Sequence, residues 1–399
     1  MDSTLAQSQD QTRIASHSGS RLFIIGFILP CIVALLLVGF SLAVLFSNRE
    51  NIGPVEAARI QHQAQGGLYG SSIVYRPYPY KMELYRLTNP DVAIVGSSRA
   101  MPFLAAGFSA SEANLGGAVR DMATGERMVA EILPIHRPKL VLFALDYWWF
   151  NPARIDDGTE EVETGAEIDF TLDDLIAPYR WMGAGVRLSN LLHTMRERAD
   201  PPLIGALANQ NESGFDVGGA YHYGDTHVQS GDRKFKSTLR LLRDGGKLSA
   251  NTEFSEEAWQ GLQHIDRMLR EDGVEVRYIM PPVASVSYAR MKENGIGLIT
   301  ALQDHLASSG MRFYDFTDPA TLGSPDCEFV DGRHGGHVTY LRILRAMQPD
   351  IESVPATRGL IKPVAELDRL ITANSGRTTL HDEPGPPEVD FLQIGCNKS

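Results

Sequence analysis

The stretch that decides the fold reads Asp91-Val-Ala-Ile-Val-Gly-Ser-Ser-Arg-Ala100, four apolar residues that lead into a turn of small residues. The pattern predicts a buried strand over residues 92–95, followed by a turn and then a helix. In doubly wound sheets the carboxyl ends of the strands face the binding crevice, where a helix N-terminus points its N–H groups at a ligand. Ser98 therefore lies where a serine hydroxyl can act as a nucleophile. Gly-Ser-Ser turns also occur in proteins where the serine has no catalytic role. This motif therefore supports a catalytic function only when a second motif accompanies it.

Apolar runs alternate with amphipathic stretches along the rest of the chain, as parallel α/β folds require. The run Leu140-Val-Leu-Phe-Ala-Leu145 is continuously apolar, which suits a strand that is covered on both faces. The sequence therefore predicts an α/β fold, a three-layer sandwich with a mainly parallel sheet. Further strands are expected at residues 140–145, 274–280 and 312–316, and helices at residues 125–133, 256–271, 285–308 and 338–347.

The alternation of strands and helices stops between residues 151 and 250. This stretch contains Gly-rich turns and one expected helix, residues 186–198. Segments this long within compact domains are usually functional. We therefore expect one domain over residues 91–350 that carries an insertion at 151–250. Residues 47–90 are expected to link the domain to what precedes it, and residues 351–399 to form a C-terminal extension.

Residues 22–46 contain no charged residue and no His, Asn or Gln. A helix of this length crosses the ~30 Å hydrocarbon core of a bilayer, and one proline, Pro30, is tolerable within it. Ser41 and Ala43 would also suit the cleavage site of a signal peptide, but the apolar run is longer than the hydrophobic region of a usual signal peptide. The sequence favours a retained transmembrane signal anchor, preceded by a disordered cytoplasmic tail over residues 1–21.

The side of the membrane on which the large domain lies is not decided by charge. Arg13 and Arg21 precede the apolar run, and Arg49 and Arg59 follow it, so the positive-inside comparison is nearly balanced. The short polar N-terminus and the large C-terminal part favour a cytoplasmic N-terminus.

Composition and charge exclude nucleic-acid binding as the function. The chain has 399 residues, a formal net charge of −12 and no evident Lys/Arg cluster, whereas nucleic-acid binding needs a basic face. The spacing of His, Cys, Asp and Glu suggests no metal site, and no cofactor is expected. Of the cysteines, Cys31 lies in the apolar run, which leaves Cys327 and Cys396 for the domain.

A second motif, Phe329-Val-Asp-Gly-Arg-His-Gly-Gly-His-Val-Thr-Tyr340, lies near the end of the α/β pattern. Asp331 precedes His334 by three residues, so a turn can bring the carboxylate to one imidazole nitrogen and leave the other facing outward as a base. The plain alternative is a pair of polar turn residues before a helix. His337 competes for the role of base, although its spacing from Asp331 is different.

Together the two motifs resemble the SGNH hydrolase superfamily, also called GDSL-like esterases. In that family a serine after the first strand pairs with a late Asp-x-x-His. The resemblance covers about residues 91–347 without the insertion, and it implies that Ser98 is the nucleophile, His334 the base and Asp331 the acid that orients it. Ser97 stands where many members have Asp.

The resemblance also implies an oxyanion hole. Asn114-Leu-Gly-Gly-Ala118 is similar to the family's second block, whose glycine donates a backbone N–H; Gly117 is the expected donor and Gly116 the alternative. The N–H of Ser98 would be a second donor.

The third block of the family departs from the pattern here. It normally supplies an Asn side chain, but Asp146 lies nearest that position, and an ionised carboxylate repels an oxyanion. Asn151, five residues further on, is the expected substitute. Trp148 and Trp149 either stack on sugar rings or belong to the core. Arg99 and Asp146 are expected, with the two tryptophans, to contact substrate.

Three features make the chain resemble membrane-anchored, envelope-facing members of the superfamily: the N-terminal anchor, the Val-Gly-Ser-Ser-Arg form of the first block, and the stretch Leu-Asp-Tyr-Trp-Trp-Phe-Asn151. This implies a location in the inner membrane with the domain on the periplasmic side, an exported polysaccharide or acyl ester as substrate, and a membrane-bound O-acyltransferase as partner. The function expected is a serine esterase or O-acyltransferase. A catalytically silent scaffold for polysaccharide assembly is the alternative, and a hydrolase of lipids or small esters is a third.

An oxidising compartment would favour a disulfide between Cys327 and Cys396. Such a bond would fasten the C-terminal tail beside the loop that carries Asp331. The alternative is two unpaired thiols.

Overall fold

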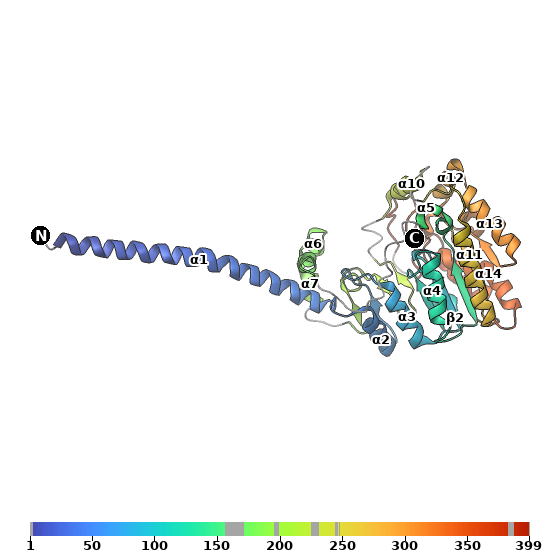
Figure 1. Cartoon of the computed structure of the whole chain (residues 1–399), viewed down its shortest axis with the longest axis horizontal. Coiled ribbons are helices and arrows are strands. Elements are labelled where there is room, and N and C mark those ends of the chain that lie inside the picture. The colour runs from blue at the N-terminus through green and yellow to red at the C-terminus, as the bar shows by residue number, and fades with distance from the viewer. Residues whose placement is uncertain are drawn as a thin grey trace. The chain divides into compact units, whose positions relative to one another are not determined.

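The structure is a computed structural model that describes residues 3–155, 171–194, 199–224, 231–243, 246, 248–381 and 387–398. The chain forms two compact units (Figure 1). The first comprises Met1–Asn51 and Asp169–Arg198, and the second Ile52–Ile168 and Ala199–Ser399.

The first unit is built on a single long helix, α1 (Ser3–Ser47). Its segment Gly26–Ser47, 22 residues, is the one helix among the described residues that is long and apolar enough to span a membrane. At ~1.5 Å per residue it is roughly 33 Å long. The predicted membrane-spanning segment is therefore confirmed as a helix of sufficient length and apolar composition. The disordered tail is not found, because helix α1 already begins at Ser3; Ala, Gln and Arg are compatible with continuing a helix that an apolar segment has started.

Two short helices from the insertion, α6 (Ala177–Gly183) and α7 (Leu188–Thr194), belong to this unit. The Tyr179 hydroxyl donates to the Leu37 carbonyl of α1 at 2.6 Å, and Asn48 donates to Thr194 at 3.3 Å. The helix expected at residues 186–198 is therefore shorter, and residues 195–198 lie outside the described part of the chain.

The second unit is organised by a five-stranded sheet in which every pairing is parallel. The order β3-β2-β4-β8-β9 corresponds to 2-1-3-4-5 along the chain, the flavodoxin-like order of doubly wound sheets. The strands are β2 (Val92–Gly96), β3 (Glu112–Gly116), β4 (Leu140–Ala144), β8 (Glu275–Met280) and β9 (Phe313–Asp315). All four predicted strands are confirmed. Strand β3 was not predicted, since its sequence Glu-Ala-Asn-Leu-Gly has no β-branched or aromatic residue.

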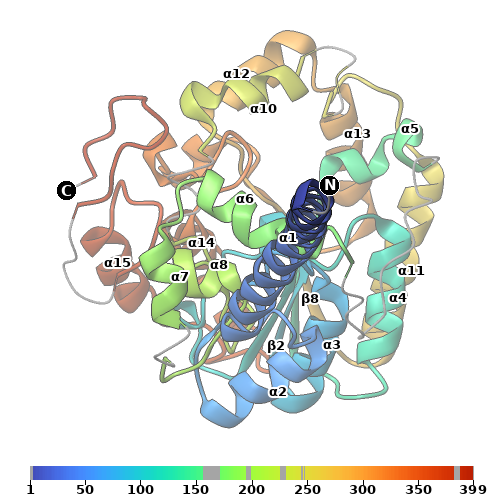
Figure 2. The same ribbon diagram turned by 90° about the vertical axis from the view of Figure 1, so that its left-hand side faces the viewer.

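Apolar side chains on both faces of this sheet are buried. Val95 and Phe143 belong to one cluster with residues of α4 (Met122–Ile132), α11 (Glu256–Glu271) and α13 (Gly297–Ser309). Ile94 and Leu142 belong to another with residues of α14 (His337–Ser353) and α15 (Val364–Ala373). Figure 2 shows α4 and α11 on one side of the strands and α14 and α15 on the other. The continuously apolar strands reflect this burial on both faces.

Three of the four predicted helices are confirmed, as α4, α11 and α14, although α14 continues to Ser353, six residues beyond its predicted end. The helix predicted at residues 285–308 is wrong as a single element. It is divided into α12 (Ser285–Asn294) and α13, because Gly295 has φ +99°, which ends a helix.

A small second sheet joins the expected linker to the insertion. Its order is β5-β1-β6-β7, with strands Leu203–Ile204, Leu68–Tyr69, Gly214–Phe215 and Tyr221–His222. Residues 47–90 are thus not a plain linker: they also form α2 (Pro54–Ala64) and α3 (Pro77–Thr88), which pack together in a buried cluster that includes Ala57, Leu84 and Met101. The other short α-helices in the described part of the chain are α5 (Pro152–Ile155), α8 (Ala206–Asn211) and α10 (Lys236–Leu241).

The C-terminal extension is folded onto the domain. Cys327 and Cys396 form the predicted disulfide, with a Cα–Cα distance of 5.6 Å. Phe391 and Leu392, in the tail that this bond holds, pack with Phe235 and Phe329. The bond thus connects the tail to the loop that precedes Asp331.

The double variant Cys327→Ser/Cys396→Ser should be less stable than the wild type. The bond closes a loop between residues 69 apart, and the loop-entropy relation gives about 4 kcal/mol for a loop of this size. Denaturant unfolding of the full chain in detergent would measure the loss. Cys31→Ser, which removes the exposed free cysteine, is the control and should leave the midpoint unchanged. Equal midpoints for all three proteins would contradict a stabilising bond.

Candidate active site

The turn after strand β2 presents Ser98. Ser98 begins a single 3-10 turn, Ser98–Ala100, and the Ser97 hydroxyl caps it by accepting the Arg99 N–H at 3.1 Å. Buried Asn114 donates to the carbonyls of Ala100, Met101 and Phe103 at 3.0, 3.1 and 2.9 Å. Strand β3 thereby holds the turn that carries Ser98 in one conformation.

The loop before α14 presents His334. The Asp331 carboxylate accepts the backbone N–H groups of Arg333 and His334 at 2.8 and 2.9 Å, and its second oxygen lies 2.8 Å from His334 Nδ1. A further bond from the Val330 N–H to the His334 carbonyl, 2.8 Å, closes the loop. The predicted turn is confirmed, with one imidazole nitrogen held by the carboxylate.

The two loops meet. Ser98 Oγ lies 2.9 Å from His334 Nε2, although the two residues are 236 positions apart in the chain. This is the reach required between a nucleophile and its base, with the base oriented by a third group. The predicted convergence of Ser98, His334 and Asp331 is confirmed as geometry. An arrangement of this kind can deprotonate the serine hydroxyl for attack on a carbonyl carbon.

Asp331 is held in its ionised form. Burial opposes the charge, but His334 and the N–H of Arg333 outweigh that effect and hold the pKa of Asp331 well below its usual range. The carboxylate therefore keeps its charge at neutral pH and can stabilise a protonated His334.

His337 is not placed to act as the base. It is buried, its Nε2 donates to the Tyr221 carbonyl at 3.0 Å, and its Nδ1 accepts the Leu380 N–H at 3.3 Å. Burial, with the nearby His222, lowers the pKa of His337 to about 3. Both nitrogens have backbone partners, so this histidine joins the small sheet and the C-terminal extension to α14.

The expected glycine of the oxyanion hole is not free to donate. The Gly117 N–H already donates to the carbonyls of Gly96 and Ser97 at 3.0 and 2.9 Å, and the alternative, Gly116, donates to the side chain of Asn114 at 2.8 Å. Gly117 has φ +88°, a turn that brings the chain back across the end of β2. This corrects the prediction from the resemblance.

The expected Asn, Asn151, lies directly before α5. The Asn151 side-chain oxygen accepts the Ala153 N–H at 3.0 Å, at the start of α5, and Asn151 makes no bond to Ser98 or His334 in the described part of the chain. Of the three donors expected, the Gly117 N–H is engaged elsewhere, whereas no acceptor is found among the described residues for the Ser98 N–H or for the side-chain amide of Asn151.

Arg99 and Asp146 form a buried ion pair rather than a substrate-binding surface. Arg99 Nη1 lies 3.0 Å from Asp146 Oδ1, and the side chains are only 2% and 1% exposed. Arg99 also donates to the carbonyls of Pro281 and Pro282. Burial raises the pKa of Asp146, and Arg99 opposes the shift. The pair connects the ends of β2, β4 and β8 next to the turn that carries Ser98.

Trp148 and Trp149 belong to the core. They are 8% and 4% exposed and lie in the cluster that includes Tyr147 and Phe150. Trp148 also contacts the Arg99 guanidinium, 5.2 Å from its ring. Neither offers a free face to a sugar, so of the two interpretations left open by the sequence, burial is the correct one.

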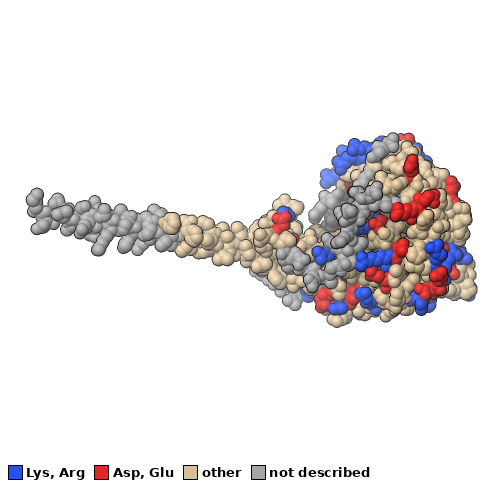
Figure 3. Space-filling model, in the orientation of Figure 1, with Lys and Arg blue, Asp and Glu red and all other residues tan. Residues whose placement is uncertain are grey.

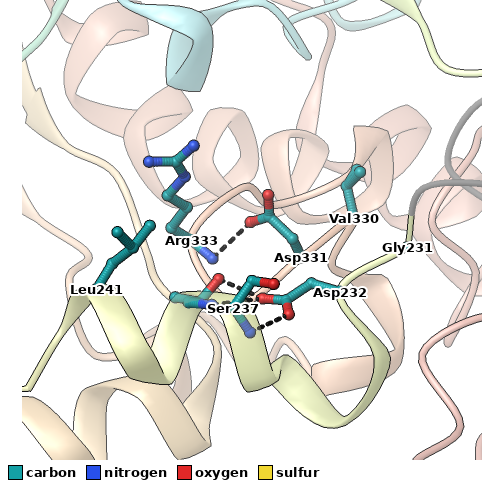
Figure 4. Close-up of a pocket in the computed structure, with 8 residues that line it drawn as sticks. Gly231, Asp232, Ser237, Leu241, Val330, Asp331 and Arg333 are labelled. Atoms are coloured by element: carbon teal, nitrogen blue, oxygen red, sulfur yellow. Dashed lines mark hydrogen bonds between the residues drawn. The ribbon is translucent and has the colours of Figure 1, made fainter.

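A pocket of about 180 Å³ opens beside the acid–base loop. Figure 4 shows Asp331 and Arg333 on one wall and Asp232 and Ser237, from the segment around α10, on the other. Sequence reasoning missed Arg333 as a site residue, although it lies within the Asp-Gly-Arg-His motif. Among the described residues no three His, Cys, Asp or Glu side chains are grouped to hold a metal ion.

No protein-family model matches this chain, and a search of curated proteins gives no match. The residues of the site are therefore the basis for inferring its chemistry.

Proposed function

We propose that this protein is a membrane-anchored serine esterase or O-acyltransferase with the three-layer fold of SGNH hydrolases. The observation that carries the proposal is the hydrogen-bonded series from Ser98 through His334 to Asp331, 2.9 and 2.8 Å. It lies at the carboxyl end of β2, where the strand order 2-1-3-4-5 reverses, and this switch point is where doubly wound sheets bind ligands.

In the proposed reaction, His334 accepts the proton of Ser98 as the serine oxygen attacks an ester carbonyl. The Ser98 N–H stabilises the oxyanion, and His334 then gives the proton to the leaving alcohol. Water or a sugar hydroxyl accepts the acyl group from the serine in a second attack, with His334 again as base. Asp331 holds the imidazole in place and stabilises its charge.

The substrate that we propose is an exported cell-envelope polysaccharide, with the domain on the periplasmic side of the inner membrane. The apolar segment of α1 supports attachment to a membrane. The resemblance to envelope-facing members supports the choice of a polysaccharide, with a membrane-bound O-acyltransferase as the partner that supplies acyl groups.

A catalytically silent scaffold is the second candidate, because the oxyanion hole is incomplete. The Gly117 N–H donates elsewhere and Asn151 makes no described bond to Ser98 or His334, whereas each lost oxyanion donor costs on the order of 10² to 10³ in rate. The ionic and hydrogen-bonded surroundings of Ser98 would then serve only structure.

A fluorophosphonate probe separates the two candidates, since it reacts only with a serine that a base activates. The full chain in detergent should be labelled on Ser98, as located by peptide mass analysis. His334→Ala should label at least about 10³-fold more slowly, because the base is lost. Ser97→Ala is the control and should retain labelling on Ser98. A wild type that does not react would reject the enzyme and favour the scaffold.

A further inference from the structure

Exposed cations gather on one short segment of the insertion. Arg233, Lys234, Lys236, Arg240 and Arg243 lie within eleven residues, in and around α10, and all five are exposed. We call these five residues the basic ledge. Figure 3 shows Lys and Arg side chains gathered at the end of the domain where α10 and α12 lie. The cluster is not evident from the order of residues, because apolar and hydroxyl residues separate the cations along the chain.

The fold does not neutralise these charges. No described carboxylate forms an ion pair with any residue of the basic ledge, in a chain whose formal net charge is −12. Lys236 and Arg240 are also four positions apart in a helix, and like charges at that spacing disfavour it. A local excess of unpaired positive charge on an acidic protein indicates an anionic ligand.

The basic ledge borders the candidate active site. Ser237, Thr238 and Leu241, which alternate with its cations along α10, line the same pocket as Asp331 and Arg333. Asp232, also in that wall, uses its carboxylate to accept the N–H groups of Ser237 and Thr238 at 2.6 and 2.9 Å. Arg333 forms no ion pair with a described carboxylate, although its charge helps to lower the pKa of Asp331, and it is the one described cation that lines the pocket.

The segment is held firmly where it is. Lys234 and Phe235 both have left-handed backbones, φ 54° and 55°, a conformation that side-chain packing must maintain. Phe235 packs with Phe391 and Leu392, and the Lys234 N–H donates to the Leu392 carbonyl at 2.7 Å. The C-terminal tail, anchored by its disulfide, therefore positions the basic ledge beside the pocket.

We propose that the basic ledge and Arg333 bind the anionic groups, carboxylates or phosphates, of a polysaccharide whose ester lies at Ser98. This inference deepens the proposed function and rests on it. A polymer fits better than a lipid surface, because the basic ledge borders the pocket that Asp331 lines, next to the loop that carries His334. A chain of charged sugars can occupy both places at once.

Binding, rather than activity, tests the inference. The full chain in phosphatidylcholine nanodiscs should bind polygalacturonate and poly(glycerol phosphate) but not neutral dextran, and the affinity should fall as salt rises. Lys236→Ala/Arg240→Ala should weaken binding on the order of tenfold, given the usual strength of exposed ion pairs. Preference for one of the two polymers would identify the anionic group.

The matched control is Arg267→Ala/Arg369→Ala. It removes two cations that are also exposed and unpaired, but on α11 and α15. Its affinity for polygalacturonate should stay within about twofold of the wild type, since long-range charge effects are screened. Lys236→Gln/Arg240→Gln, which keeps long polar side chains, should behave as the alanine pair does, with an unfolding midpoint like that of the wild type.

Three results would overturn the inference: no binding of either charged polymer, equal weakening in the ledge and control variants, or ledge-dependent binding to phosphatidylglycerol vesicles alone. Ser98→Ala should bind the polymers like the wild type. A wild type that binds the charged polymers but neither hydrolyses an ester nor reacts with the fluorophosphonate probe would therefore point to a failure of the proposed function, and not of the basic ledge.

Discussion

Ser98→Ala should lower the rate of hydrolysis of a short-chain aryl ester by at least about 10³-fold, because serine triads lose most of their catalysis with the nucleophile. The 2.9 Å contact with His334 Nε2 is the reason to expect this size of effect at one hydroxyl. The measurement is kcat for the full chain in detergent, before and after the substitution. Unfolding of the variant should match the wild type, since only one oxygen atom is removed.

Ser97→Ala is the control for this experiment. Its hydroxyl caps the turn but makes no contact with His334, so most of the activity should remain. Equal activity in the wild type and Ser98→Ala would remove Ser98 from the mechanism. No activity in either protein would favour the scaffold, in agreement with the occupied N–H of Gly117.

Arg99→Ala should destabilise the domain by about 3 to 5 kcal/mol, the usual cost of removing one partner from a buried ion pair. Asp146 would be left buried without its 3.0 Å partner, and the carbonyls of Pro281 and Pro282 would lose their donor. Denaturant unfolding of the full chain would give the change in free energy. The expected change is a loss of folding stability, and it does not depend on whether Ser98, the neighbouring residue, is a nucleophile.

Two further variants separate this effect from a general loss of charge. Arg127→Ala breaks an exposed pair with Glu131 and should cost no more than about 1 kcal/mol. Arg99→Met/Asp146→Leu removes both buried charges and should regain most of the stability lost in Arg99→Ala. An Arg99→Ala protein as stable as the wild type would show that Arg99 and Asp146 are not paired in the folded protein.

The elements that were predicted correctly are those whose signal is local. Strands β2, β4 and β8 are continuous apolar runs, and burial on both faces explains why. Strand β3 was missed, because its place in the sheet depends on pairing with β2 and on Asn114 rather than on its own composition. The break between α12 and α13 was missed too, although Gly295 was visible in the sequence.

Part of the candidate site was also local. Asp331 and His334 are three residues apart, so the turn that joins them could be inferred from spacing alone. Which N–H groups are available to an oxyanion could not be inferred from the sequence. Whether the N–H of Gly117 faces a ligand or a carbonyl depends on its φ of +88° and on the carbonyls at the end of β2, neither of which a motif records.

The sequence by itself determined the apolar segment that could span a membrane, the alternation of strands and helices, and the turn from Asp331 to His334. Each depends on residues close together in the chain. The tertiary structure alone decided that Ser98 meets His334, that Trp148 and Trp149 are buried, and that the basic ledge lies beside the pocket. The physical reason is that these contacts join residues far apart in the chain, where burial and charge neutralisation depend on what packs against each side chain.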